Sequence, residues 1–196
     1  MNEKNPPVKI VRSRTRNQLR TEAYMLRKKF GLESQEKFPI MEFLELIMPQ
    51  IDSEFQVLPV EDSELPGRAA ETFPDLHLMR VKQSVYDAAC NGGYWARLVM
   101  AHELGHYICH GDESPSYAYP VSGEKIPDAV DPEKQADIFA AELLAPVNLI
   151  QGLSDYLVSK RFGVPRSIAR IQMNQAKKIQ RRHHRKRQHA YAKRNG

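Results

Sequence analysis

The segment MAHELGHYICH, residues 100–110, decides how the rest of the chain is interpreted. It has the character of an apolar helix, yet it carries three histidines and one glutamate. His102 and His106 are one helical turn apart and project from the same face, so their imidazoles can bind one ion. Glu103 lies beside that face, where a carboxylate can take a proton from water. The H-E-x-x-H spacing therefore predicts two zinc ligands and one general base.

The same residues have a plainer interpretation, in which the two histidines are core residues bonded to the backbone and the glutamate is exposed. Extended metzincin spacing is excluded, because Cys109 and Asp112 stand where that pattern requires glycine and histidine. His110 lies two turns after His102 and is a less favoured ligand, because the helix is expected to end there. Its alternative role is to cap that helix end, where a cation is favourable.

A second helix, predicted over DPEKQADIFAAELLAP at residues 131–146, offers a better third ligand. Asp131 is the expected N-cap. Glu133 and Asp137 are one turn apart on a stripe that otherwise faces the core, and carboxylates on such a stripe need partners. We expect Glu133 to bind the metal and Asp137 to accept the outer N–H of a ligating histidine. The remaining candidates for the third ligand are Asp112, Glu113 and Glu142. In the plainer interpretation, Glu133 binds no metal and only interacts favourably with the N-terminus of its helix.

Periodicity along the rest of the chain indicates one α+β unit, a small β-sheet packed on helices that include the H-E-x-x-H helix, with a C-terminal helical extension. Expected helices cover residues 14–30, a short stretch that stops at Pro49, residues 94–110, and two segments joined at Gly163–Pro165. Expected strands are FQVLPV and LHLMRVKQ, separated by a loop at ELPGRAAETFPD. Residues 111–130 are expected to form a long surface loop.

The formal net charge of +5 hides an uneven distribution of charge. Residues 31–155 carry seven basic and twenty-two acidic residues, whereas residues 156–196 carry thirteen basic residues and no acidic residue. A run of basic residues is usually a solvated surface, but it is also typical of a segment that binds an anionic partner. Another interpretation is that it docks on the acidic body of the chain, residues 31–155. The candidate nucleic-acid-binding residues are Lys177, Lys178, Arg181, Arg182, Arg185, Lys186 and Arg187.

RLVMAHELGHYICH followed by EKQADIFAAELLAP resembles the ImmA/IrrE family of metallopeptidases, and the resemblance extends over residues 16–173. It implies a gluzincin-like fold, with His102, His106 and Glu133 as zinc ligands and Glu103 as the general base. The family pattern has asparagine or aspartate at the position of Asp137. The resemblance further implies limited proteolysis of a regulatory protein, typically a helix-turn-helix repressor, which switches on the genes that the repressor controls.

On this interpretation the chain divides into an N-terminal tail at 1–13, a metallopeptidase domain at 14–150, a helical hairpin at 151–175 and a mobile basic tail at 176–196. The start of the chain lacks the pattern of a secretory signal, and no apolar run is long enough to cross a membrane, so a cytoplasmic location is expected. Two other functions stay open. One is a DNA-binding regulator with a non-catalytic metal, based on LVSKRFGVPRSIARIQ, and the other is a toxin–antitoxin interaction module.

Overall fold

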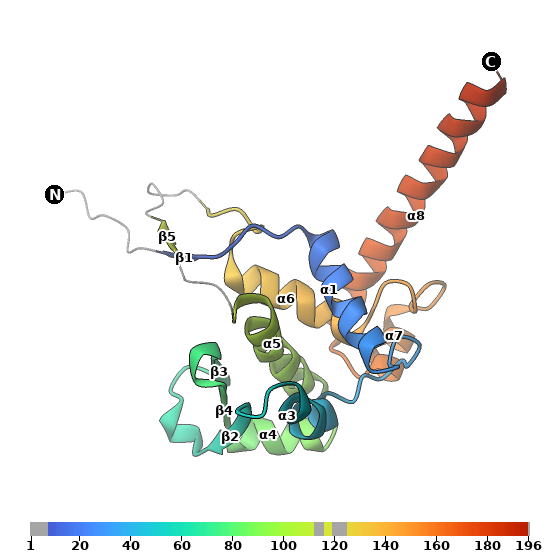
Figure 1. The fold of residues 1–196 in the computed structure, drawn as a ribbon. Coiled ribbons are helices and arrows are strands. Elements are labelled where there is room, and N and C mark those ends of the chain that lie inside the picture. The colour runs from blue at the N-terminus through green and yellow to red at the C-terminus, as the bar shows by residue number, and fades with distance from the viewer. Residues whose placement is uncertain (1–7, 112–115, 119–124, 196) are drawn as a thin grey trace.

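The computed structural model describes residues 8–111, 116–118 and 125–195. It shows the predicted α+β fold, in which a small sheet packs beside a group of helices (Figure 1). In the part of the chain that is described, no helix is long and apolar enough to cross a membrane. The core lies between the sheet and the helices and includes Phe43, Met79, Met100 and Phe139, all fully buried.

The sheet has the strand order β2-β4-β3, formed by Gln56–Val60, Leu78–Lys82 and Ala70–Phe73. β2 pairs with β4 in parallel, and β3 pairs with β4 antiparallel, with Thr72 opposite Met79. β2 and β4 lie where the sequence predicted strands. The loop predicted at ELPGRAAETFPD is wrong in part, because it contains β3. This strand has four residues between Gly67 and Pro74, too few to show an alternating pattern.

Helix α1 spans Arg16–Lys29 and begins at Thr15, whose side chain and that of Gln18 form a capping box. The next helical stretch consists of α2 (Ile40–Glu42), a π-helical turn (Phe43–Ile47) and α3 (Met48–Ile51). The prediction that Pro49 ends this stretch is wrong. The wide turn places the proline in the first turn of α3, where a missing N–H is tolerated.

Helix α4 (Gln83–Cys90) was not predicted, and it leads through Gly93 into α5 (Tyr94–His110). The bounds of α5 agree with the prediction. Helix α6 spans Pro132–Leu144, and the Asp131 side chain accepts hydrogen bonds from the backbone N–H groups of Glu133 and Lys134. The predicted N-cap of α6 is therefore confirmed.

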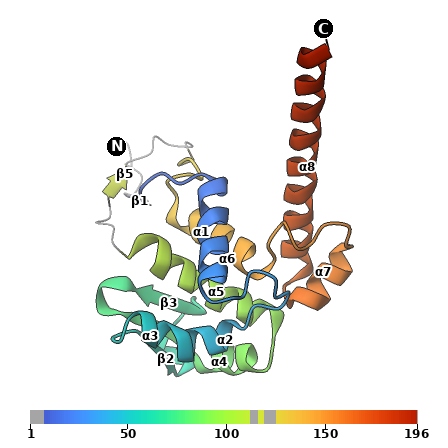
Figure 2. The same ribbon diagram turned by 45° about the vertical axis from the view of Figure 1, so that its right-hand side comes forward.

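Helices α5 and α6 pack against each other (Figure 2). Gly105 of α5 faces Ala136 of α6 in this contact. A methyl group at this position would lie 3.1 Å from the Cα atom of Ala136 and 3.2 Å from its carbonyl oxygen. It would also lie 3.3 Å from the Phe139 ring. Because two of these contacts are with backbone atoms, a larger residue at 105 would force the two helices apart.

The C-terminal part is a hairpin of α7 (Asp155–Phe162) and α8 (Arg166–Asn195), joined through Gly163 in the left-handed conformation. Arg97 on α5 donates a hydrogen bond to the carbonyl oxygen of Gly163, and Gln172 on α8 donates to two carbonyls at the end of α6. These hydrogen bonds attach the hairpin to α5 and α6, which belong to the body of the molecule. Residues 176–195, which were predicted as a separate mobile tail, continue α8 without a break.

The predicted N-terminal tail also contains regular structure. Strand β1 (Val8–Ile10) pairs antiparallel with β5 (Ser116–Ala118), which lies in the predicted surface loop. Residues 1–7 of that tail lie outside the described residues. After β1 the chain stays close to the start of α6, because the backbone N–H of Val11 donates to the carbonyl of Val130.

The close packing at Gly105 generates a prediction about stability. Replacing a helical glycine with alanine normally stabilises a helix by about 1 kcal/mol. In Gly105→Ala, we expect the overpacking cost of about 1–3 kcal/mol to exceed this gain, so that the variant unfolds at a lower temperature. Thermal denaturation of both proteins in the presence of a chelator measures the difference. An increased midpoint would contradict the close packing of α5 on α6.

Candidate metal centre

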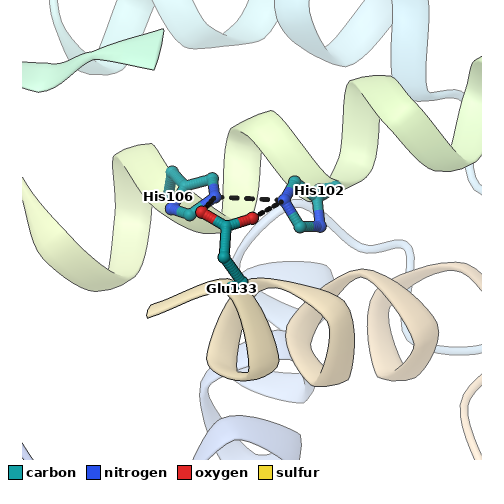
Figure 3. Close-up of side chains that lie close together, drawn as sticks. All are labelled: His102, His106 and Glu133. Atoms are coloured by element: carbon teal, nitrogen blue, oxygen red, sulfur yellow. Dashed lines mark hydrogen bonds and ion pairs between the residues drawn. The ribbon is translucent and has the colours of Figure 1, made fainter. Parts of the chain in front are cut away.

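Three of the predicted ligands meet between α5 and α6 (Figure 3). The Nε2 atoms of His102 and His106 are 3.0 Å apart. The two carboxylate oxygens of Glu133 lie 3.3 Å from Nε2 of His102 and 3.4 Å from Nε2 of His106. The histidines are half-buried, whereas 67% of the Glu133 side chain is exposed. The structure therefore brings together two residues of one helix and one residue that follows them by about thirty positions.

The spacing of these atoms fits a tetrahedral metal ion. Zinc binds histidine nitrogen at about 2.0–2.1 Å and carboxylate oxygen at a similar distance, which places tetrahedral ligand atoms about 3.3–3.4 Å apart. The three distances in the site lie close to that value. Two imidazoles and one carboxylate are also a donor set found in catalytic zinc sites, where a fourth position stays open.

Asp137 lies one turn after Glu133 and supports His102 from outside the cluster. Its Oδ1 atom is 3.1 Å from Nδ1 of His102. Burial lowers the pKa of His102, but hydrogen bonds to Asp137 and Glu133 outweigh this effect and raise the pKa to about 9. The two histidines hold the pKa of Glu133 well below its ordinary value. A metal ion must therefore displace a proton from His102 near neutral pH.

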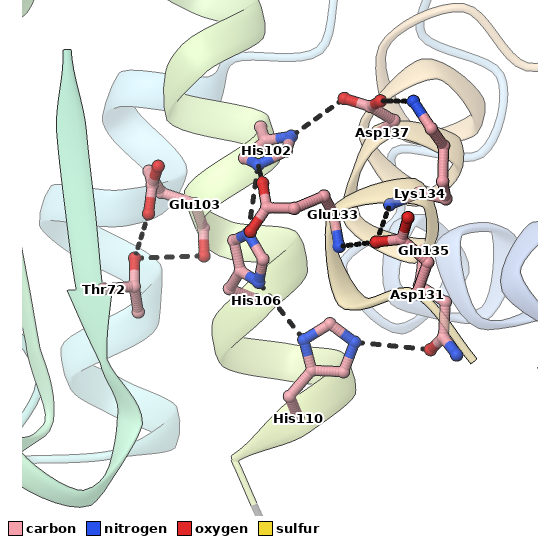
Figure 4. A network of polar contacts seen from close by, with 10 residues as sticks. All are labelled: Thr72, His102, Glu103, His106, His110, Asp131, Glu133, Lys134, Gln135 and Asp137. Atoms are coloured by element: carbon pink, nitrogen blue, oxygen red, sulfur yellow. Dashed lines mark hydrogen bonds and ion pairs between the residues drawn. The ribbon is translucent and has the colours of Figure 1, made fainter. Parts of the chain in front are cut away.

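His106 has a corresponding support, in His110, that the sequence did not reveal (Figure 4). The Nδ1 atoms of the two rings are 3.2 Å apart, and Nε2 of buried His110 is 3.3 Å from Oε1 of Gln135. The amide of Gln135 donates from Nε2 to the carbonyls of Arg12 and Ala129. Its Oε1 must therefore accept, and Arg14 also donates to this oxygen.

These contacts fix where the protons of both imidazoles lie. Because Oε1 of Gln135 is an acceptor, Nε2 of His110 carries the proton and Nδ1 has the lone pair. With a metal ion in place of the proton on Nε2, Nδ1 of His106 would then donate to His110, and Nε2 of His106 would be available to bind the ion. This is the tautomer that a metal-binding histidine needs. The sequence made His110 a minor ligand candidate or a helix cap, whereas in the structure it contacts the outer side of His106.

Glu103 points away from the three clustered side chains and toward the sheet (Figure 4). Its Oε2 atom accepts a hydrogen bond of 2.7 Å from the hydroxyl of Thr72 on β3, which also contacts the Glu103 carbonyl at 3.3 Å. Only 7% of Glu103 is exposed. Sequence reasoning missed Thr72, because it lies in the segment that was predicted as a loop.

A cleft of about 660 Å³ connects these groups. The clustered residues and Glu103 line it together with one edge of the sheet and the first half of α5. The remaining lining residues include Arg68, Glu71, Thr72, Trp95, Leu98 and Val99. Trp95 is 57% exposed, so the cleft offers an apolar surface next to charged groups.

The other predicted residues lie elsewhere. Glu142 is buried and pairs with Arg20 at 2.9 Å and Arg16 at 3.8 Å, so it holds α1 against α6. Asp112 and Glu113 lie outside the described residues. The basic residues of the predicted nucleic-acid surface are on α8, which extends away from α5 and α6 in both ribbon views.

Comparison with known proteins gives one family. Residues 95–174 match the family Peptidase_M78, described as the IrrE N-terminal-like domain. The match confirms the resemblance to the ImmA/IrrE family and supports a peptidase-type function. It begins on α5, so residues 16–94, which the resemblance also included, lie outside the matched segment. A comparison with curated proteins found no match.

The carboxylates of α6 give a prediction about metal affinity. Glu133→Ala should remove most zinc binding, and Asp137→Ala should weaken it about 10–100-fold, as is usual for an outer partner of a ligand. Glu142→Ala should bind zinc normally but unfold more easily, because Arg20 and Arg16 lose their partner. Competition with a fluorescent chelator measures the affinities. If Glu142→Ala has the weakest zinc binding, the assignment of α6 is wrong.

The hydrogen bond between His106 and His110 gives a second prediction. His110→Phe removes the acceptor for the outer proton of His106 and should weaken zinc binding about 10–100-fold. His110→Gln, whose amide oxygen can accept that proton, should restore part of the affinity. The same chelator competition compares the two variants. Equal affinity in wild type and His110→Phe would show that this hydrogen bond does not orient His106.

Proposed function

Residues 95–174 match the IrrE N-terminal-like domain of Peptidase_M78, and we propose that the chain is a zinc-dependent endopeptidase of the ImmA/IrrE type. Its proposed substrate is a regulatory protein of the cytoplasm, a helix-turn-helix repressor, whose limited cleavage releases repressed genes. One observation carries the proposal, namely that His102, His106 and Glu133 converge in a cleft that Glu103 also lines. The repressor itself rests on the resemblance to the family.

Different residues of the chain are proposed to bind the metal and to transfer the proton during peptide hydrolysis. His102, His106 and Glu133 would hold the ion. When bound, zinc supplies Lewis acidity, which polarises a peptide carbonyl and lets water lose a proton near neutral pH. Glu103 lies in the same cleft as a carboxylate outside the ligand cluster, so it is the group proposed to accept that proton and deliver it to the leaving amine.

Thr72 is proposed to orient Glu103 for this transfer. A hydrogen bond from its hydroxyl occupies one carboxylate oxygen, and the buried wall between α5 and β3 restricts the rest of the side chain. A general base must be held within hydrogen-bond reach of its proton, so this fixed position supports catalysis. Through this hydrogen bond, a residue of the sheet would hold the proposed general base of α5 in position.

The cleft suits a peptide in an extended conformation. β3 is an outer strand of the described sheet, and Ala70, Glu71 and Thr72 on this strand line the cleft. A free strand edge can pair with a peptide through backbone hydrogen bonds, and side-chain pockets then select the sequence. Trp95 and Leu98 supply an apolar surface for one substrate side chain. This arrangement supports a segment of a protein as the substrate.

The alternative functions are a DNA-binding regulator and an interaction module without catalysis. The hairpin of α7 and α8 has the spacing of a helix-turn-helix, but its turn is packed on the body, where Val164 is fully buried. Arg166, at the start of α8, pairs with Asp155 at 2.9 Å. A carboxylate, that of Glu103, lines the same cleft as three assembled metal-binding groups, and this favours the enzyme over both alternatives.

Cleavage of a repressor tests this proposal. The zinc-loaded protein is incubated with the helix-turn-helix repressor encoded beside its gene, and the products are identified by intact mass. We expect two fragments from one scissile bond. Glu103→Gln should keep zinc but lose at least about 10²–10⁴-fold in rate, because the geometry survives and proton transfer does not. Full activity in this variant would overturn the mechanism.

Thr72 gives a further prediction. Thr72→Val keeps the shape of the side chain but removes its hydrogen bond to Glu103, so cleavage should slow by about tenfold to a hundredfold. Zinc affinity should stay unchanged, because Thr72 does not contact the ligands. Thr72→Ser retains the hydroxyl and serves as the matched control. An unchanged rate in Thr72→Val would exclude a positioning role.

A further inference from the structure

The second half of α8 stands apart from the rest of the molecule. Gln172 and Ala176 are buried against the body, Ile179 packs on it and Gln180 donates a hydrogen bond to Gln151, whereas residues 181–195 continue the helix beyond it (Figures 1 and 2). From residue 180 onward, every side chain whose burial is described is exposed. At about 1.5 Å per residue, the projecting part of the helix is about 22 Å long.

This projecting helix is strongly basic. The described and exposed cationic side chains of residues 177–195 are Lys177, Lys178, Arg181, Arg182, Arg185, Arg187 and Lys193. The sequence contains no acidic residue after Asp155, so no carboxylate of the helix offsets them. Lys177, Arg181 and Arg185 follow one another at intervals of four residues, where like charges repel and destabilise an isolated helix. A polyanion bound along the helix would relieve this repulsion.

We propose that residues 177–195 form a binding surface for double-stranded DNA. The proposal does not depend on the peptidase function, and the surface lies outside the segment that matches the family. It also differs from the helix-turn-helix alternative, which would use the start of α8. Here the start of the helix is fastened to the body, and the exposed end binds the duplex.

The composition of the helix distinguishes DNA from other anionic partners. A membrane surface would require an apolar face, but residues 177–188 contain one aliphatic side chain, that of Ile179. Single-stranded nucleic acid is usually held by stacking of successive bases on several aromatic rings, and residues 177–195 contain one aromatic residue among Phe, Tyr and Trp, namely Tyr191. The acidic body of the chain is an unsuitable partner, because the helix projects away from it in both views.

The shape of the helix favours DNA over double-stranded RNA. An α-helix with side chains is about 10–12 Å wide, and the major groove of B-form DNA is about 12 Å wide. The major groove of A-form RNA is too narrow to accept it. Because the exposed half of α8 has no neighbouring element around it among the described residues, the groove can enclose it. Arginine side chains on opposite sides can then reach phosphates of both strands.

Fluorescence anisotropy with a labelled DNA duplex tests the proposal. The full-length protein is titrated at several concentrations between about 50 and 200 mM salt, and the slope of log K against log salt is determined. The test variant is Arg181→Gln, Arg182→Gln and Arg185→Gln combined. The matched control is Lys28→Gln, Lys29→Gln and Lys160→Gln, which removes three positive charges from exposed positions elsewhere.

We expect the wild type and the control to bind with a steep dependence on salt. The test variant should bind at least about tenfold more weakly, and its slope should become shallower by about 0.9 for each phosphate that it no longer neutralises. Glutamine is nearly as good a helix former as arginine, so the helix should persist in circular dichroism. Equal binding by the test and control variants would overturn the proposal. Absence of binding by the wild type at the lowest salt concentration, or tighter binding to duplex RNA or anionic vesicles, would also overturn it.

Discussion

The site depends on the close approach of α5 to α6. His102 and His106 lie on one helix and Glu133 on the other, so the distance between the helix axes sets the distance between the ligands. Gly105 lies between the two histidines and faces the backbone of Ala136, where a side chain of any size would separate the helices. The glycine of the H-E-x-G-H sequence thus has a packing role that makes the metal-binding geometry possible.

A second set of polar contacts orients the two histidine ligands. Asp137 holds the outer nitrogen of His102, and Gln135, through His110, determines the tautomer of His106. Gln135 is in turn held by carbonyls that precede α1 and α6. The orientation of His106 therefore depends on how the N-terminal segment packs against the start of α6. The metal centre is a product of the assembled fold, and the H-E-x-x-H helix alone would not create it.

The sequence predicted the parts of the site that follow from helical spacing. Residues one turn apart share a face, so His102 with His106 and Glu133 with Asp137 could be paired without a structure. Contacts between elements were not predictable in this way. Thr72 lies on a strand of four residues between turn-forming residues, and Gln135 looks like an ordinary helical residue. The continuity of α8 was missed because its charges suggested a mobile tail, although arginine, lysine and glutamine are good helix formers.

X-ray absorption spectroscopy of the zinc-loaded protein tests whether His102, His106 and Glu133 bind the metal together. We predict one zinc ion per chain, bound only by nitrogen and oxygen at about 2.0–2.1 Å, with the outer-ring scattering of two imidazoles. In Glu133→Ala the zinc content should fall sharply, because one of the three ligands is lost. A sulfur neighbour at about 2.3 Å, which would indicate Cys109, or the signal of three imidazoles would contradict the assignment.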